Sequence, residues 1–173
     1  IQVAILENGR LVEYYWEQDH QERLLGNIYK GRVDNILPGM EAAFVDIGVD
    51  KNAFLYVGDL FNRGPNREIQ DLLKVGDSVL VQVFKEAEGN KGPRVTTEIG
   101  LPGRYLVLLP FQDHLGVSRQ IVDEKERSRL KALADGIRPP QMGLIVRTVA
   151  EGCDQEELER DLKDLLDKWQ SIE

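Results

Sequence analysis

The chain has 173 residues, of which 42% are hydrophobic and 30% are charged, so it can bury one sizeable hydrophobic core or two small ones. No apolar run is as long as a membrane span and no signal peptide opens the sequence, so we expect a soluble protein of the cytoplasm. The single cysteine, Cys153, excludes an internal disulfide, and we expect its thiol to be inert. Because the chain opens at Ile1 rather than at methionine, we expect it to be a fragment of a longer protein.

The net charge of −8 would argue against a nucleic-acid partner if the charge were spread evenly along the chain. It is not, because residues 151–173 contain nine carboxylates and three basic side chains. Between Lys91 and Arg119, four basic residues outnumber two acidic ones. A local positive surface is therefore compatible with the acidic composition.

Residues 1–16 form the first predicted element, a β-hairpin. Two alternating runs meet at Asn8-Gly9, and both residues tolerate the positive φ that a type I′ turn requires. An isolated two-stranded ribbon is marginal in water, so the hairpin needs a partner sheet. We expect it to pair with predicted strands at 104–110 and 143–149.

Residues 26–57 organise the middle of the chain. Apolar and polar residues alternate in short runs, and Pro38-Gly39 supplies a turn between two of them. Close strand spacing with a glycine at each corner is typical of a small, strongly curved barrel. A loop and a short helix follow, and further strands complete a segment that is otherwise all-β.

The rest of the chain combines strands and helices. A pattern like a capping box begins a helix at Asp123, and the prolines at 139–140 prevent that helix from resuming. In the last helix Leu158, Leu162 and Trp169 share one apolar face. The predicted fold is α+β, with the barrel inserted into an α/β domain.

Several long motifs occur in one order along nearly the whole chain. They are GNIYKGRVDNILPGMEAAFVDIG, KNAFLYV, GNKGPRVTTEI, GRYLVLLP and GLIVRT. These motifs resemble those of the ribonuclease E/G family, the bacterial endoribonucleases of messenger-RNA decay and ribosomal-RNA processing. The resemblance implies an S1-type five-stranded OB-fold β-barrel inserted into an RNase-H-like α/β domain. It places the first part of the RNase-H-like domain at 1–26, the OB-fold at 27–98 and the second part, with a 5′-end sensor, at 99–173.

The resemblance assigns RNA-binding roles to residues of the barrel. Phe44 and Phe54 match the family's aromatic positions that pack against a base of single-stranded RNA, and Lys91 matches a basic residue beside them. Aromatic stacking with a nearby cation binds a strand without reading its sequence, because every base has a π-face. Tyr29 and Lys30, at the start of the barrel, are further candidates for RNA contact.

A second set of residues matches the family's sensor for a 5′-monophosphate. Arg147 and Thr148 match its phosphate donors, Gly103 and Val107 complete the pocket, and Arg119 falls near the same site. An arginine guanidinium can bind a phosphate in a bidentate manner, and a threonine hydroxyl adds a neutral donor.

The resemblance also implies what lies elsewhere. The family's metal-binding aspartates, and the zinc-binding cysteines that join its subunits, belong to domains that we expect downstream of this chain. We therefore expect no catalytic residue, metal site or cofactor in the chain itself. The parent enzyme is expected to use Mg²⁺ and to be a homo-oligomer.

Each assignment has an alternative when the residues are considered alone. Phe44 and Phe54 lie in apolar strands and could belong to the core, and the other barrel candidates could be ordinary surface residues. Arg147 could cap the sheet or pair with the acidic last helix. Asp161 and Asp164 stand three residues apart on that helix, and we interpret them as a solvated acidic face rather than a metal site.

The predicted function is that of the RNA-binding and 5′-monophosphate-sensing portion of a single-strand-specific, Mg-dependent endoribonuclease. Its partner would be single-stranded RNA, preferably with a 5′-monophosphate, and the fragment alone should not cleave. The alternative function is that of a non-catalytic OB-fold adaptor that binds RNA or a protein. A third possibility is that the acidic helix and the hydrophobic barrel face serve assembly only.

Overall fold

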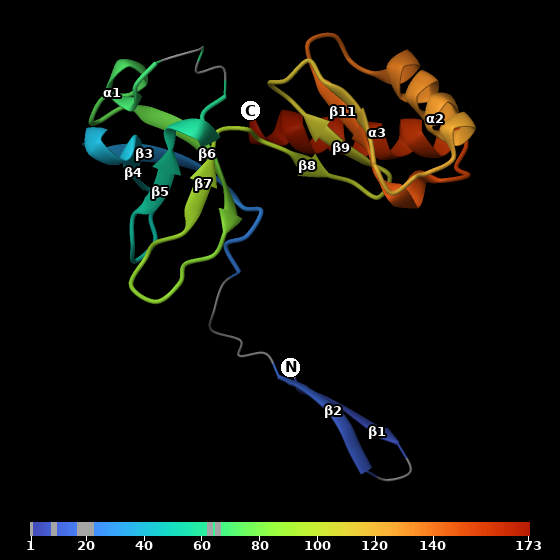
Figure 1. Ribbon diagram of the computed structural model, residues 1–173, viewed down its shortest axis with the longest axis horizontal. Helices are drawn as coiled ribbons and strands as arrows, with labels where there is room; N and C mark the ends of the chain where they lie inside the picture. The colour runs from blue at the N-terminus through green and yellow to red at the C-terminus, as the bar shows by residue number, and fades with distance from the viewer. Residues whose placement is uncertain (1, 8–9, 17–22, 62–63, 65–66) are drawn as a thin grey trace.

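The computed structural model describes residues 2–7, 10–16, 23–61, 64 and 67–173. Figure 1 shows a β-hairpin, a β-barrel and an α/β unit that ends with the C-terminal helix. The mixed α+β class predicted from the sequence is confirmed. Among the described residues, no helix is long and apolar enough to cross a membrane.

The barrel is closed by five strands that pair in the order β3-β4-β5-β7-β6. The pairing of β5 with β7 is parallel, and the neighbouring pairings are antiparallel. The strands are β3 (Ile28–Leu37), β4 (Ala42–Asp46), β5 (Ala53–Tyr56), β6 (Ser78–Lys85) and β7 (Arg94–Thr96). The connections include the 3-10 turns η1 (Pro38–Met40) and η2 (Val57–Asp59) and the short helix α1 (Ile69–Leu72). The predicted five-stranded OB-type barrel is therefore confirmed.

Strong curvature of β3 allows the barrel to close, because this strand pairs with both β4 and β6. Gly31 makes the curvature possible, since a Cβ atom there would lie only 2.5 Å from Cγ1 of Val45. The barrel core is made by side chains that alternate with outward ones along the strands. Its fully buried members include Val33, Val45, Leu55, Val81 and Val95, and Ile69 of α1.

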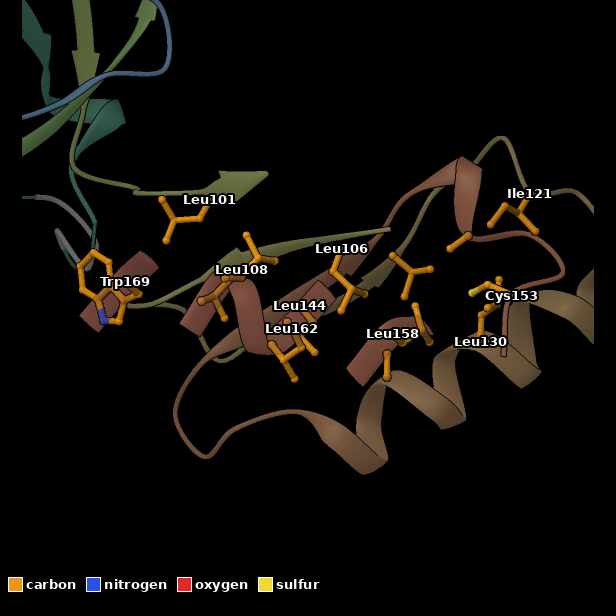
Figure 2. Close-up of a cluster of buried hydrophobic side chains, with 14 of the residues drawn as sticks. Leu101, Leu106, Leu108, Ile121, Leu130, Leu144, Cys153, Leu158, Leu162 and Trp169 are labelled. Carbon is orange, nitrogen blue, oxygen red and sulfur yellow. The ribbon is translucent and has the colours of Figure 1, made fainter. Parts of the chain in front are cut away.

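The α/β unit contains a four-stranded sheet in the order β10-β11-β9-β8. Its strands are β8 (Leu101–Pro102), β9 (Leu106–Leu109), β10 (Leu115–Val117) and β11 (Gly143–Val146). Helix α2 (Glu124–Ile137) connects the parallel neighbours β10 and β11, and α3 (Gln155–Ile172) packs against β8 and β9. Figure 2 shows Leu106, Leu108 and Leu144 of the sheet in one core with Leu158 and Leu162 of α3.

Helix α3 begins with a capping box at Asp154. The Asp154 side chain accepts a hydrogen bond from the Glu157 backbone amide at 2.9 Å, and the Glu157 side chain accepts one from the Asp154 amide at 3.1 Å. This reciprocal capping box satisfies amides that the first helical turn leaves without partners. The helix is then positioned to present its apolar face to the sheet.

Contacts between described side chains join the barrel to the α/β unit, and two of them are specific. The Gln82 side chain donates to the Gly100 carbonyl and accepts from the Gly100 amide, both at 2.9 Å. Phe111 contacts Phe61 of the barrel segment at 6.2 Å between ring centroids and Trp169 of α3 at 5.3 Å. The three rings connect the two parts through side-chain packing.

The hairpin is separate from both sheets. Within the described residues, β1 (Gln2–Glu7) and β2 (Arg10–Trp16) pair only with each other, and the predicted turn at 8–9 lies outside those residues. The predicted pairing of the hairpin with the strands at 104–110 and 143–149 is therefore wrong.

Gly26, just before β3, is bound to the barrel, because its amide donates to the Val83 carbonyl at 2.8 Å. The sheet of the α/β unit forms its ladders among β8 to β11. Leu6 and Leu11 of the ribbon are consequently more than half exposed. The domain boundaries at 26–27 and 98–99 stay a prediction.

Candidate nucleic-acid interface

Two aromatic side chains face outward from the barrel. Phe44 of β4 pairs directly with Phe54 of β5, and their ring centroids lie 6.1 Å apart in an edge-to-face arrangement. Their neighbours Val45, Ala53 and Leu55 are fully buried, whereas both phenylalanines are partly exposed. The alternative that these rings belong to the barrel core is therefore wrong.

A groove of about 960 Å³ opens over these two rings. Its other walls are the loops before β5 and before β7. A hydrogen bond joins the two loops, because the Lys51 ammonium donates to the Gly89 carbonyl at 2.7 Å. Gly92 allows the loops to approach, because a Cβ atom there would lie 2.0 Å from the Asn52 carbonyl oxygen. The lining residues are Met40, Phe44, Asp50, Lys51, Asn52, Phe54, Tyr56, Asn90, Lys91, Gly92 and Arg94.

The groove is locally positive although the chain is acidic. Lys51, Lys91 and Arg94 line it together with one carboxylate, Asp50. Arg94 also forms an ion pair with Asp59 at 3.1 Å. Aromatic rings with flanking cations are the combination that binds single-stranded nucleic acid without sequence preference.

The sequence-predicted barrel residues fall into two groups. Phe44, Phe54 and Lys91 all line the groove. Tyr29 and Lys30 lie on β3 beside β6 and are not part of the lining, and the Tyr29 hydroxyl instead accepts a hydrogen bond from the Asn27 side chain at 3.2 Å.

Lys51 and Tyr56 also line the groove, although the sequence analysis did not single them out. Tyr56 shares its outward direction with Phe54 by the two-residue period of a strand. The strand period could therefore have identified Tyr56 as a groove residue from the sequence.

The second predicted cluster gathers where β10 and β11 end. One guanidinium nitrogen of Arg147, Nη1, donates to the Gly103 carbonyl. The Thr148 hydroxyl is hydrogen-bonded to the Ser118 hydroxyl at 2.8 Å and donates to the Gln120 side chain at 3.0 Å. Sequence reasoning missed Ser118 and Gln120, whose role as partners of Thr148 depends on the pairing of β10 with β11.

The two remaining residues of this cluster are near neighbours of those contacts. Arg119 stands between the two partners of Thr148 in the chain, and Val107 pairs with Pro102 directly before Gly103. The structure therefore brings Arg147 to Gly103 by a direct contact and places the other predicted residues on adjoining segments.

Asp161 supports the turn that carries Gly103. Its carboxylate accepts hydrogen bonds from the backbone amides of Arg104, Tyr105 and Leu106 at 2.9, 2.8 and 2.8 Å. A Cβ atom on Gly103 would lie 2.6 Å from both carboxylate oxygens, so only glycine fits there without displacing this side chain. The interpretation of Asp161 as part of a solvated acidic face is therefore wrong, because its carboxylate connects α3 to the β8–β9 turn.

Charged side chains also contact Tyr105, next to this turn. The Tyr105 hydroxyl donates to Glu157 at 2.9 Å, and this hydrogen bond, with burial, raises the pKa of Tyr105. The Arg104 guanidinium lies 5.0 Å from the centroid of the Tyr105 ring. It adds a cation that the sequence-based list of site residues did not contain.

No metal-binding cluster is present in the part of the chain that the structure describes: no three His, Cys, Asp or Glu side chains lie close enough to hold an ion. The side chains of the groove and of the cluster at Arg147 offer aromatic faces, hydrogen-bond donors and positive charge to a ligand.

Comparisons with a family profile and with curated proteins indicate the same family. A sequence profile of the Ribonuclease E/G family matches residues 100–173. Ribonuclease G of Haemophilus influenzae is 41% identical over 181 residues, which cover 98% of this chain and 37% of that protein. Ribonuclease E of Synechocystis sp. is 44% identical, over 99% of this chain and 27% of that protein. The chain thus spans well under half the length of these relatives.

Among solved structures, a complex of a/eIF2alpha, aDim2p and rRNA from Pyrococcus horikoshii is similar with a TM-score of 0.38 and 16% identity. The similarity covers 68% of this chain and 58% of the chain in that complex.

Proposed function

The chain belongs to the ribonuclease E/G family, and from that premise we propose that it is the RNA-binding and 5′-monophosphate-sensing part of a single-strand-specific endoribonuclease. The observation that carries the proposal is the outward pair Phe44 and Phe54 at the base of a groove with a lysine on each loop. Similarity to ribonucleases over almost the whole chain favours this function over that of a non-catalytic adaptor.

Binding in the groove follows from two kinds of contact. Bases of any identity stack on Phe44 and Phe54, because an aromatic face has no hydrogen-bonding pattern to match. Lys51 and Lys91 neutralise the phosphates that connect those bases, and release of counterions makes binding sensitive to salt. A duplex cannot present its bases in this way, so the groove selects single strands.

Sensing of the 5′ end follows from the cluster at Arg147. A guanidinium carries five N–H donors, so the Nη1 contact with Gly103 orients the group and leaves other donors to face a terminal phosphate. Arg119 supplies a second cation on an adjoining segment, and the Thr148 hydroxyl donates to the phosphate after it rotates away from Gln120. A 5′-hydroxyl end offers no such anion and gains nothing from this pocket.

Hydrolysis is proposed for the parent enzyme and not for this chain. In the parent, Mg²⁺ held by aspartates outside this chain would activate the attacking water. We further propose that the parent is a homo-oligomer and processes ribosomal RNA and degrades messenger RNA in the cytoplasm.

The test compares two RNAs of one sequence, carrying either a 5′-monophosphate or a 5′-hydroxyl. The wild-type chain should bind the phosphorylated RNA more tightly, and Arg147→Ala should reduce that preference about tenfold or more, since a hydrogen bond to a charged group is lost. Phe54→Ala should weaken both RNAs alike. Arg160→Ala, an exposed arginine of α3, is the matched control and should change neither.

Three results would contradict the proposal. Absence of RNA binding by the wild-type chain would refute both proposed binding sites. Equal binding of the two RNAs by the wild-type chain, or an unchanged preference in Arg147→Ala, would refute the 5′-end sensor but not the RNA-binding groove.

A further inference from the structure

The two phenylalanines of the groove begin a row of paired positions that continues across the barrel. Phe44 of β4 pairs with Phe54 of β5, and Phe54 pairs in turn with Arg94 of β7. Arg94 is opposite Lys85 of β6, and the register shifts between Val83 and Lys85. Strands β4, β5, β7 and β6 are consecutive neighbours in the barrel (Figure 1). Their paired positions therefore form one row.

Phe84 lies in the irregular step of β6. Phe84 has no partner residue on β7 and is 41% exposed, while Val83 before it is buried and Lys85 after it is exposed. The Arg94 guanidinium carbon lies 5.0 Å from the centroid of the Phe84 ring. An exposed aromatic ring is thus held beside a planar cation at the far end of the row.

The charge on Arg94 is compensated, which distinguishes this pair from the lysines of the groove. Asp59 accepts a hydrogen bond from Arg94 Nη2 at 3.1 Å and is the less exposed of the two side chains. The Lys51 ammonium, in contrast, donates to a neutral carbonyl and keeps its net charge. Phe84 and Arg94 therefore suit the flat face of a base better than a phosphate.

We infer that Phe84 and Arg94 form an additional nucleotide-binding subsite, where an unpaired base of single-stranded RNA stacks against the Phe84 ring and the Arg94 guanidinium. The inference rests on the proposed function, since the RNA must first occupy the groove at Phe44 and Phe54. The base can have any identity, because the contact is to its π-face.

The distance between the subsites sets the length of RNA required. Strand β6 lies two strands beyond β5, which is roughly 10 Å at about 4.8 Å per strand. At about 3.4 Å per stacked nucleotide, the strand must extend two to three nucleotides past Phe54 to reach Phe84. A trinucleotide with bases on both Phe44 and Phe54 extends only one nucleotide past Phe54 and does not reach Phe84, whereas an octanucleotide does.

The experiment measures binding of tri- and octauridylate to the 173-residue chain by titration calorimetry. Phe84→Ala should lower the affinity for the octanucleotide by about 5- to 150-fold, the range for loss of one stacked base, and leave the trinucleotide unchanged. Phe54→Ala should weaken both. Phe61→Ala is the matched control, because this ring is similarly exposed, at 38%, but lines a different pocket.

Salt dependence separates stacking from charge. Phe84→Ala should leave the slope of log affinity against log salt unchanged, whereas Lys91→Ala should reduce its magnitude by about 0.7. Phe84→Leu, which keeps an apolar side chain in the bulge, serves if the alanine variant unfolds. It should show the same loss for the octanucleotide.

The outcomes distinguish the two proposals. If Phe54→Ala loses affinity and a folded Phe84 variant does not, the subsite is refuted and the groove stands. Equal losses for the tri- and octanucleotide in Phe84→Ala would also refute the subsite, since they indicate a general disturbance of the barrel. Absence of binding by the wild-type chain would overturn both proposals, and a change in self-association of Phe84→Ala in place of RNA affinity would assign the ring to a protein contact.

Discussion

Replacement of Asp161 by alanine should destabilise the α/β unit by about 2–4 kcal/mol. The carboxylate accepts three backbone amides, and those of Tyr105 and Leu106 are partly buried. A buried donor left without a partner costs about 1–3 kcal/mol, and access of water to the exposed Arg104 amide limits the total. The same substitution releases the Gly103 turn, so the preference for a 5′-monophosphate should decline with stability.

The matched control is Asp164→Ala on the same helix. Asp164 is exposed, and both substitutions gain the same helix propensity, so the difference between them isolates the contacts of Asp161. Urea unfolding followed by circular dichroism should place Asp164→Ala within about 0.5 kcal/mol of the wild type. Equal stability of the two variants would show that the carboxylate does not hold the β8–β9 turn.

Two further predictions concern titration and thiol chemistry. Hydrogen bonds from the Arg129 side chain and the Gly152 amide lower the pKa of Glu126 from 4.5 to about 2. A lowered folded-state pKa stabilises above the unfolded value, so this contribution should be complete above pH 4.5 and lost as the pH falls toward 2. Thermal unfolding of Glu126→Gln against pH should lack that part of the acid dependence, and parallel curves would exclude it. Cys153 is buried and burial raises the pKa of its thiol, so the native chain at pH 7.5 should react with a thiol reagent far more slowly than the unfolded chain; equal rates would contradict this.

The two-residue period of β-strands and the residue types at the turns explain why much of the barrel was predictable. The alternation of apolar and polar residues around Pro38-Gly39 determined short strands, and closely spaced strands with glycine corners favour closure. The same period puts Phe44 opposite in direction to Val45, and Phe54 opposite to Leu55. It does not say which of the two directions is the core, and the residues alone favoured the wrong one for both phenylalanines.

Asp161 and Asp164 show that the local sequence pattern does not distinguish an aspartate with tertiary hydrogen bonds from an exposed one. They have the same chemistry, the same helix and nearly the same neighbours in the chain, yet the first accepts amides from residues 55 to 57 positions away and the second is exposed. The hairpin of residues 1–16 is the opposite case, since its strands were predictable but, among the described residues, they pair only with each other and not with the expected sheet.

The sequence by itself thus determined the elements, their approximate order in two kinds of sheet and, through its motifs, the residues to examine. Only the tertiary structure decided that Arg147 contacts Gly103, that Asp161 holds the turn beside it and that Phe84 meets Arg94. The physical reason is the separation in sequence between the residues that interact. Strand and helix periods are set by neighbouring residues, whereas these three contacts depend on which strands pair, where a bulge shifts the register and how α3 packs on the sheet.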